Sequence, residues 1–171
     1  MLSTEKILTL LNKSKIDFEV NEHKPLFRVE DSKNFKERIV GTHTKNLFLK
    51  NKKNEFCLIS CEENCDINLK KLSKSLGLGN TSFANEKYMK ELLGVLPGSV
   101  SPFALMNDTY NLVNFYLEKE LDDSELLNFH PLINTATITI SRIDFIKFMI
   151  ENNKKIHIFS VIENVIIRTY E

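Results

Sequence analysis

The sequence predicts a mixed α/β fold, of the α+β kind, because short helical and strand-like segments alternate along its whole length. The chain has 171 residues, enough for one domain to bury a hydrophobic core without disulfides or structural metals. Neither an internal repeat nor a low-complexity linker interrupts the pattern. We therefore expect a single domain over residues 1–171.

The N-terminal part predicts a helix followed by a strand. Leucine and isoleucine recur on one side of residues 4–15, and Ser3 or Thr4 can cap the first turn. Residues 17–23 alternate between apolar and polar side chains, as a half-buried strand does. Residues 23–27 then predict an extended corner, because a residue before proline avoids the helical conformation.

A surface helix and two strands are expected next. The polar run 30–38 predicts a short helix that leads into a glycine-containing loop. Residues 46–49 and 55–60 are apolar and predict strands, and the turn-prone segment 50–54 joins them.

Two amphipathic helices follow, each with its own start and stop signals. Residues 68–76 carry a leucine stripe and end at Gly77. Residues 85–93 repeat the pattern, with Asn85 as the cap and Gly94 as the stop.

The middle of the chain predicts a loop and a hairpin. Residues 94–102 are rich in glycine, proline and serine and predict a long loop. Residues 103–106 and 111–117 are apolar and predict two strands paired around Asn107 and Asp108.

The C-terminal part predicts one more helix between strands. We expect a short helical turn at 124–127 and a strand at 134–140, where threonine alternates with apolar residues. Ser141 can cap the helix that follows. Residues 155–159 and 165–169 predict two strands, or one strand and an appendage.

Overall charge excludes a global electrostatic attraction to nucleic acid or to an anionic membrane, because the formal net charge is zero. Contacts with RNA would have to come from local lysine clusters, which can equally form a solvated face. These clusters are Lys45, Lys50, Lys52 and Lys53, and Lys70, Lys71 and Lys74.

The cysteines do not predict a metal site. Cys57, Cys61 and Cys65 follow one another at intervals of four, and no second pair completes a zinc site. Cys57 lies in an apolar run and is expected to be a buried small hydrophobe. No disulfide, signal peptide or membrane span is expected, so we predict a cytoplasmic protein.

Three polar positions could carry chemistry, each with a plainer alternative. Lys45 and Asn46 stand at the start of a strand, where they can point at a ligand or form a solvated strand end. Ser99 lacks the motif of a hydrolase nucleophile. His130 precedes a proline and can be a structural histidine, a ligand or a base.

Three sequence blocks together resemble one known family, the freestanding prolyl-tRNA editing proteins of the ProX (or PrdX) branch of the YbaK superfamily. The first runs from Gly41 to Lys50 and reads Gly-Thr-His-Thr-Lys-Asn-Leu-Phe-Leu-Lys. The others begin Pro-Gly-Ser-Val-Ser-Pro-Phe-Ala-Leu at Pro97 and Asn-Phe-His-Pro-Leu at Asn128, and residues 23–30 are a weaker fourth match. The resemblance covers about residues 5–150, and 151–171 would be a C-terminal extension of the same domain.

The resemblance implies a YbaK-like fold, in which flanking helices cover a central mixed or antiparallel sheet. It also implies hydrolysis of the ester in mischarged tRNA(Pro), most typically the alanyl ester, without a metal or other cofactor. The expected partners are the acceptor end of aminoacylated tRNA(Pro) and, transiently, prolyl-tRNA synthetase, with no role for DNA or membrane. A substrate hydroxyl could activate the water.

The resemblance also implies roles in catalysis and substrate binding for individual residues. Backbone N–H groups near Gly98 would polarise the ester carbonyl, and Lys45 would hold the ribose, the phosphate or the scissile region. Asn46 and His130 would line the amino-acid pocket. Thr42 and Ser101 depart from the family's alanine and threonine. The catalytic candidates are Lys45, Gly98 and Ser99, the substrate-binding candidates are Thr44, Asn46, His130, Phe27 and Pro102, and the expected apolar walls are Leu26, Phe27, Phe103 and Leu105.

Two alternatives remain open at this point. The same fold could remove cysteine in place of alanine. A binding module could also sense prolyl-tRNA or proline without hydrolysing anything.

Overall fold

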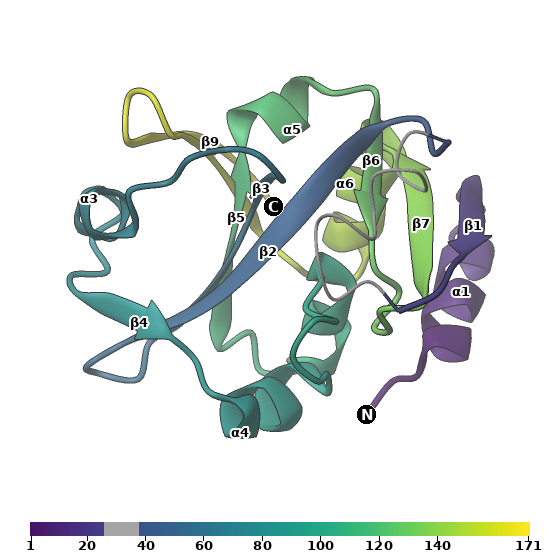
Figure 1. Cartoon of the computed structure of the whole chain (residues 1–171), viewed down its shortest axis with the longest axis horizontal. Helices are drawn as coiled ribbons and strands as arrows, with labels where there is room; N and C mark the ends of the chain where they lie inside the picture. The colour runs from purple at the N-terminus through teal and green to yellow at the C-terminus, as the bar shows by residue number, and fades with distance from the viewer. Residues whose placement is uncertain (26–37) are drawn as a thin grey trace.

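The computed structural model describes residues 1–25 and 38–171, and its strands form one mixed sheet. The strand order is β1-β7-β6-β2-β3-β5-β8-β9, and β4 pairs with β2 outside this path (Figure 1). The predicted fold class, a mixed sheet with helices, is confirmed. The strands are β1 (Phe18–Glu22), β2 (Thr42–Asn51), β3 (Phe56–Glu62), β4 (Thr81–Phe83), β5 (Val113–Glu118), β6 (Leu126–Phe129), β7 (Ala136–Ser141), β8 (Ile156–Ser160) and β9 (Val165–Tyr170).

Strand β2 joins two halves of the sheet. It pairs antiparallel with β3 over most of its length, but parallel with β6 only at Thr42 and His43. Beyond His43 the two strands part, so that β2 crosses the molecule diagonally while β6 continues beside β7, which in turn pairs with β1 (Figure 1). The polar residues at the start of β2 therefore lie where the sheet divides.

Several helices follow a residue whose side chain caps their first turn. Asn68, Asn85 and Ser141 each accept a backbone N–H from the first turn of the helix that follows, and the sequence predicted this role for Asn85 and Ser141. The helical segments are α1 (Thr4–Lys13), α3 (Leu69–Ser75), α4 (Glu86–Tyr88), the π-helical turn η1 (Met89–Leu93), the 3-10 helix η2 (Pro102–Asn107), α5 (Lys119–Asp123) and α6 (Arg142–Glu151).

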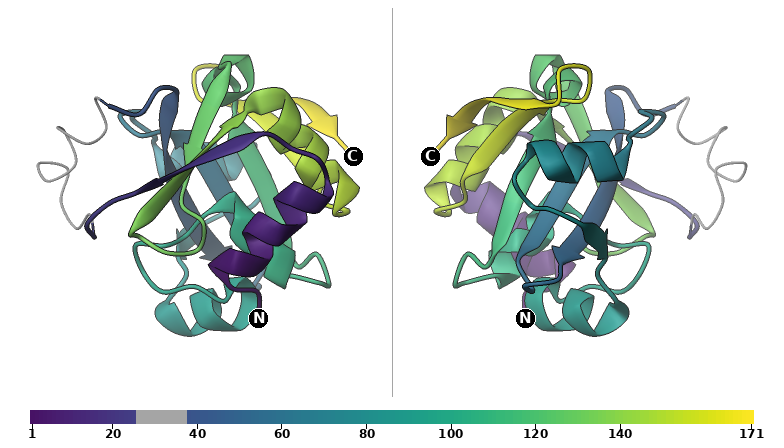
Figure 2. Two further views of the ribbon diagram at one scale, coloured as in Figure 1. Left: turned by 90° about the vertical axis from the view of Figure 1, so that its right-hand side faces the viewer. Right: turned by 90° about the vertical axis from the view of Figure 1, so that its left-hand side faces the viewer.

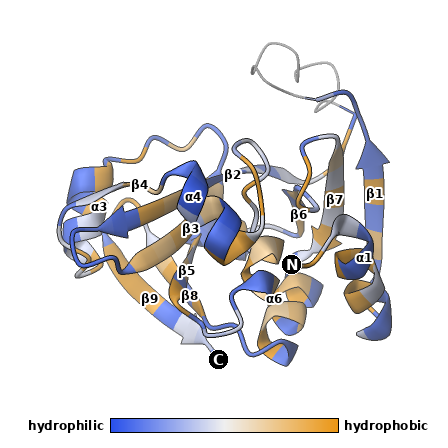
Figure 3. Ribbon diagram, turned by 90° about the horizontal axis from the view of Figure 1, so that it is seen from below, coloured by the Kyte–Doolittle hydropathy of each residue, from blue (hydrophilic) through white to orange (hydrophobic). Residues whose placement is uncertain are grey.

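Alternate residues of β3 enter two core clusters on opposite faces of the sheet. Phe56 and Leu58 belong to the larger core cluster, to which α1, η2, α5 and α6 contribute. Cys57 and Ile59 belong to the smaller core cluster, which α3 covers (Figure 2). In Figure 3 the hydrophobic colour follows β3, β5, β8 and α6 through the interior, whereas much of β1 is hydrophilic.

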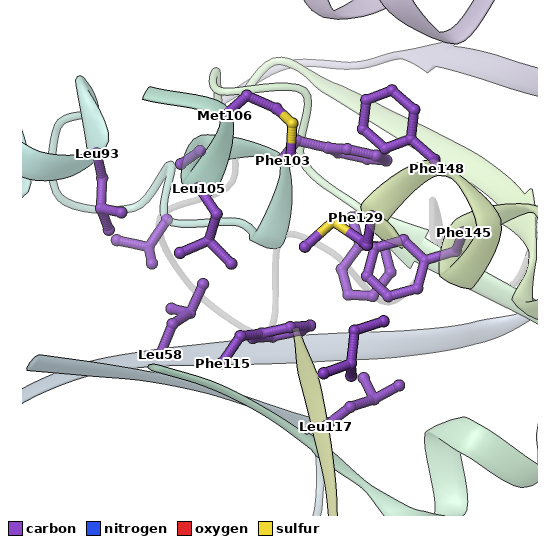
Figure 4. Packing of buried hydrophobic residues seen from close by; sticks show 14 of the residues in the cluster. Leu58, Leu93, Phe103, Leu105, Met106, Phe115, Leu117, Phe129, Phe145 and Phe148 are labelled. Atoms are coloured by element: carbon purple, nitrogen blue, oxygen red, sulfur yellow. The ribbon is translucent and has the colours of Figure 1, made fainter. Parts of the chain in front are cut away.

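Aromatic side chains fill the larger core cluster. The ring of Phe103 on η2 meets those of Phe129, Phe145 and Phe148 edge to face, at centroid distances of 6.0, 6.1 and 5.8 Å (Figure 4). Edge-to-face pairs add to the free energy gained from burial alone. The packing fixes η2, and with it the loop that precedes it, against the sheet.

Two predicted elements are wrong. The segment expected as a hairpin contains helix η2 instead of a first strand, because Pro102 fits the first helical turn and Ser101 caps it. Strand β5 then runs parallel to β3 and β8. Half of the turn expected at 124–127, Leu126 and Leu127, belongs to strand β6, which pairs with β7, and the helical turn lies just before it as α5.

The remaining expectations have mixed outcomes. The strands expected in the tail are both present, as β8 beside β5 and β9 beside β8. The helix expected over 85–93 changes from α to π geometry at Met89. The expected helix at 30–38 falls almost wholly outside the described residues. Across residues 1–25 and 38–171, no helix is long and apolar enough to cross a membrane.

Candidate functional site

Neighbouring residues at the start of β2 face opposite sides of the sheet. In the β2–β3 ladder Lys45 pairs with Cys61 and Asn46 pairs with Ser60. Because side chains alternate along a strand, Asn46 shares the face of the larger core cluster, whereas Lys45 shares the face of the smaller one. The structure therefore separates two residues that the sequence places side by side.

On the Asn46 face, hydrogen bonds hold the polar side chains of β2. The Ser60 hydroxyl donates to Oδ1 of Asn46 at 2.6 Å. The Thr44 hydroxyl donates to the carbonyl of Asn128 on β6 at 2.7 Å. Thr44 and Asn46 thus share one face, beside the point where β2 and β6 part.

Asn128 connects three segments at this point. Its Nδ2 donates to the carbonyl of Val40 at 3.0 Å, and its Oδ1 accepts from the Thr139 hydroxyl at 2.7 Å. Only 3% of Asn128 is exposed, so these bonds satisfy a buried amide. The residue fixes β6 against β7 and against the chain that enters β2.

The Gly98 loop presents backbone to the same region. Gly98 has a φ of +86°, and a Cβ placed on it would lie 3.9 Å from Nδ2 of Asn134. The Ser99 N–H donates to the carbonyl of Leu96 at 3.0 Å and is thus committed to the turn. Within the described ranges, no acceptor is recorded for the Gly98 N–H. Ser99 itself is buried, and Pro102 is buried at the start of η2.

His130 stands at the start of the turn between β6 and β7. Its Nδ1 lies 3.0 Å from the carbonyl of Ala136, and a carbonyl only accepts, so Nδ1 carries the proton. The ring of His23 lies 6.1 Å away between centroids, and its Nε2 contacts the Thr137 hydroxyl at 3.0 Å. Gly98, beside Asn134, and His130 therefore approach the same β6–β7 turn.

The Lys45 face has different chemistry. The Lys45 ammonium donates to the carbonyl of Cys65, in the turn that follows β3. Burial raises the pKa of the Cys61 thiol to about 12 and also raises the pKa of Cys65. Both thiols are therefore protonated and poorly nucleophilic near neutral pH. Burial also raises the pKa of Glu118, which lies close enough to both thiols to raise their pKa values further.

Several predicted residues lie elsewhere or outside the described chain. Phe27 and Leu26 lie outside it. Phe103 and Leu105 are 0% and 1% exposed and pack in the larger core cluster. Cys57 is 1% exposed, which confirms it as a buried small hydrophobe. Among residues 1–25 and 38–171, no group of three or more His, Cys, Asp or Glu side chains could hold a metal ion.

A cavity of about 280 Å³ lies beside the loop before β5. Its lining includes Asn111, Lys154 and His157, together with Leu105, which the sequence predicted as a pocket wall, but none of the polar site candidates in the described chain. The Lys154 ammonium already donates to the carbonyl of Asp108 and to Oδ1 of Asn111, so it fixes the loop before β5. We assign this cavity no part in the site.

Sequence reasoning missed Ser60, Asn128 and Asn134 as members of the site. Asn128 and Asn134 lie within the third resembling block, but their side-chain partners come from distant segments. Ser60 is an ordinary serine in an apolar strand until the register of β3 places it opposite Asn46.

Comparison with known proteins identifies the family. The model of the aminoacyl-tRNA editing domain matches residues 23–148, which contain all three blocks and the candidate site. This chain belongs to the aminoacyl-tRNA editing domain family. The assignment to YbaK/ProX-like editing proteins is thereby confirmed.

Individual members of the editing family extend this similarity over most of the chain. The prolyl-tRNA synthetase associated domain-containing protein 1 of Bos taurus is 39% identical over 136 residues, 77% of this chain and 79% of that protein. The prolyl-tRNA editing protein ProX of Acetoanaerobium sticklandii is 29% identical over 153 residues, 89% and 93% of the two chains.

A solved structure shares the fold. It is described as that of a candidate trans-editing enzyme for prolyl-tRNA synthetase. Its TM-score is 0.67 at 17% identity, over 91% of this chain and 96% of the other.

Proposed function

We propose that this chain is a trans-acting aminoacyl-tRNA deacylase that hydrolyses the ester of mischarged tRNA(Pro), with alanine as the amino acid removed. Membership of the editing family over residues 23–148 is the observation that carries the proposal. Similarity to the prolyl-tRNA editing protein ProX supports tRNA(Pro) as the substrate. The acceptor end would be the main partner, with transient association with prolyl-tRNA synthetase in the cytoplasm.

The Asn46 face suits the ester. Hydrolysis places negative charge on the carbonyl oxygen, and fixed N–H donors stabilise that charge. The Gly98 N–H is such a donor, because no acceptor within the described residues takes it and the absence of a side chain allows close approach. Asn46 and His130 would line the amino-acid pocket beside it. The water would be activated by a substrate hydroxyl, so none of these side chains has to act as the base.

The Lys45 face suits the nucleic acid. Among the described residues, the one hydrogen-bond acceptor recorded for the ammonium is the Cys65 carbonyl, in a half-buried setting at the end of the β2–β3 ladder. A phosphate or ribose oxygen would compete well for such a donor, because hydrogen bonds between ions are stronger than those to neutral groups. In this arrangement the terminal adenosine crosses the edge of β2, with Lys45 on its phosphate side and Asn46 on its ester side.

Alanine is the expected amino acid for a physical reason. A synthetase pocket built for proline rejects a smaller side chain weakly, since each missing methylene is worth about 1–3 kcal/mol. A separate site that admits alanine but excludes proline by size restores accuracy. The same logic admits cysteine, so the side-chain preference has to be measured.

A panel of tRNA(Pro) charged with alanine, cysteine or proline tests the proposal. We expect the wild-type chain to deacylate the alanyl ester fastest and to leave the prolyl ester intact, and Asn46→Ala to lose most of this activity. Preference for the cysteinyl ester would replace alanine with cysteine. Binding of the charged tRNA without any turnover above the buffer rate would refute the deacylase and favour a sensing module.

A further inference from the structure

A buried serine behind the candidate site determines how Asn46 is presented. Ser60 lies on β3 directly opposite Asn46 and is 0% exposed. Its Oγ lies 2.6 Å from Oδ1 of Asn46. Asn46 itself is only half-buried, so one end of its amide is anchored in the protein and the other can meet a ligand.

The chemistry of Ser60 selects one orientation of that amide. A buried hydroxyl that donates no hydrogen bond is costly, and within the described residues Oδ1 of Asn46 is the only acceptor recorded for the Ser60 hydroxyl. The distance of 2.6 Å also suits a bond between two oxygens, since bonds from nitrogen are typically longer. Oδ1 therefore points to Ser60, and Nδ2 points away from it.

Within the part of the chain that the structure describes, the outward Nδ2 of Asn46 has no competing partner. Across residues 1–25 and 38–171, no acceptor is recorded for Nδ2 of Asn46. Thr44, two residues earlier on the same face, is already engaged with the carbonyl of Asn128. The Asn46 amide is thus the polar group of β2 that remains available to a ligand on this face, and it offers N–H.

We propose that Ser60 is a positioning residue that holds Asn46 as a hydrogen-bond donor to the substrate. This inference rests on the proposed deacylase function. A donor can contact the ester carbonyl or a ribose oxygen, but it cannot accept a hydrogen bond from the α-ammonium group of the amino acid. Asn46 and the Gly98 N–H would then both donate toward the ester, and recognition of the α-ammonium falls to other groups.

The first test replaces the anchor and compares it with a matched control. Ser60→Ala should lower kcat for the alanyl ester about tenfold, the lower end of the effect of removing a supporting hydrogen bond at a site, with little change in KM. Ser73→Ala is the control, because Ser73 is also 0% exposed and also bonds a side chain, the Thr81 hydroxyl at 2.5 Å. It should lower Tm similarly and leave kcat unchanged. Equal kcat values for the two variants would overturn the proposal.

A double-mutant cycle separates positioning from general damage. If Ser60 acts only through Asn46, Ser60→Ala should cost nothing further in an Asn46→Ala background. A full tenfold loss in that background would show that Ser60 acts independently of Asn46.

Asn46→Asp tests whether the outward group at position 46 has to be a hydrogen-bond donor. Aspartate still accepts the Ser60 hydroxyl but presents an acceptor where Asn46 presents N–H. We expect a folded protein whose kcat is at least as low as that of Asn46→Ala. Retained turnover with a lower KM would mean that position 46 binds the α-ammonium, and the donor role would be wrong.

An NMR measurement, which needs no catalytic turnover, tests the positioning role of Ser60 separately from the proposed deacylase function. The Asn46 side-chain NH₂ signals in an NMR spectrum, assigned by their loss in Asn46→Ala, should shift and become more mobile in Ser60→Ala but not in Ser73→Ala. Unchanged signals would refute the positioning role even in an active deacylase. Shifted signals in a protein without deacylase activity would uphold the positioning and refute the function alone.

Discussion

The two faces of β2 differ in how firmly their polar groups are held. On the Asn46 face, side chains bond to one another and to β6 at 2.6 and 2.7 Å, and the Gly98 loop is fixed by η2 and its aromatic contacts. On the Lys45 face, a long flexible side chain rests on the carbonyl of Cys65. Rigid groups suit stabilisation of a reaction's charge, whereas a flexible cation suits capture of a phosphate.

The contrast shows how a short motif can serve two ends of one substrate. Consecutive residues in a strand cannot share a face, so under the proposed function Lys45 and Asn46 would reach different parts of a ligand that crosses the strand's edge. Three of the four predictions below alter one face and leave the other intact, and Asn128→Leu alters the junction between the two faces.

The largest effect is expected for Gly98→Ala, on the Asn46 face. A side chain there strains a backbone with φ of +86° and displaces the N–H that would meet the ester, so kcat/KM should fall about 100-fold, as when one oxyanion donor is lost. Gly79→Ala is the control, since Gly79 has a φ of +69° and open space around it. Both variants should lose about 1 kcal/mol in urea unfolding. A Gly98→Ala variant with normal turnover would remove this loop from the chemistry.

Asn128→Leu should weaken the junction that carries both faces. The Thr139 hydroxyl would lose its acceptor in a buried setting, at a cost of about 1–3 kcal/mol in the free energy of unfolding. The Val40 carbonyl would also lose its partner, but Val40 is 66% exposed, so that loss costs less. Adding Thr139→Val removes one of the orphaned groups and should recover part of the loss. Denaturant unfolding of the two variants measures this, and no recovery would mean that Thr139 finds another partner.

Lys45→Ala should act on binding and not on the chemical step. KM for alanyl-tRNA(Pro) should rise about tenfold with kcat nearly unchanged. The slope of log KM against log salt concentration should fall by about 1, the value expected for the loss of one phosphate contact. Lys13→Ala, at the exposed end of α1, should change neither. A fall in kcat with KM constant would mean that the ammonium leaves Cys65 and joins Asn46 at the ester.

The smallest effect concerns the carboxyl group of Glu118 on the Lys45 face. Burial raises its pKa above the usual 4.5, so the folded chain holds this proton more tightly than the unfolded chain. The contribution to stability is therefore complete below pH 4.5 and is lost as pH rises through the raised pKa. Glu118→Gln should gain stability relative to the wild type between pH 4 and pH 7 in urea unfolding. A constant difference between the two proteins would show that the carboxyl group is solvated.

Local signals predicted most elements, and pairing between distant segments explains the errors. Asn85 and Ser141 act as caps where the sequence places them, because a cap depends on residues three positions away. The parallel pairing of β5 with β3 and β8 overrode the expected hairpin, and pairing with β7 made a strand of β6. Ser101 and Pro102 were a local signal for η2, but no local pattern could have shown how β5 and β6 pair.

The site follows the same division. Blocks of resembling sequence indicated Thr44, Asn46, Gly98 and His130, which the fold brings to one region of the sheet through Asn128 and Asn134. The opposite orientation of Lys45 follows from strand alternation, but only once β2 is known to extend back to Thr42. The role of Ser60 depends on the register of β3 and was beyond reach of the sequence.

The pairing of β1 with β7 has a consequence for synthesis of the chain. Phe18 pairs with Ile140, so β1 is synthesised long before the strand with which it pairs. That edge of the sheet can form only after β7 has been synthesised. Contacts between such distant positions must overcome a large loop-closure entropy, and they slow folding. During translation, β1 would remain an unpaired strand until β7 leaves the ribosome, and it would be open to wrong partners in that interval. Its polar character, with Glu19, Asn21 and Glu22 among its five residues, disfavours such pairing while the native partner is still missing.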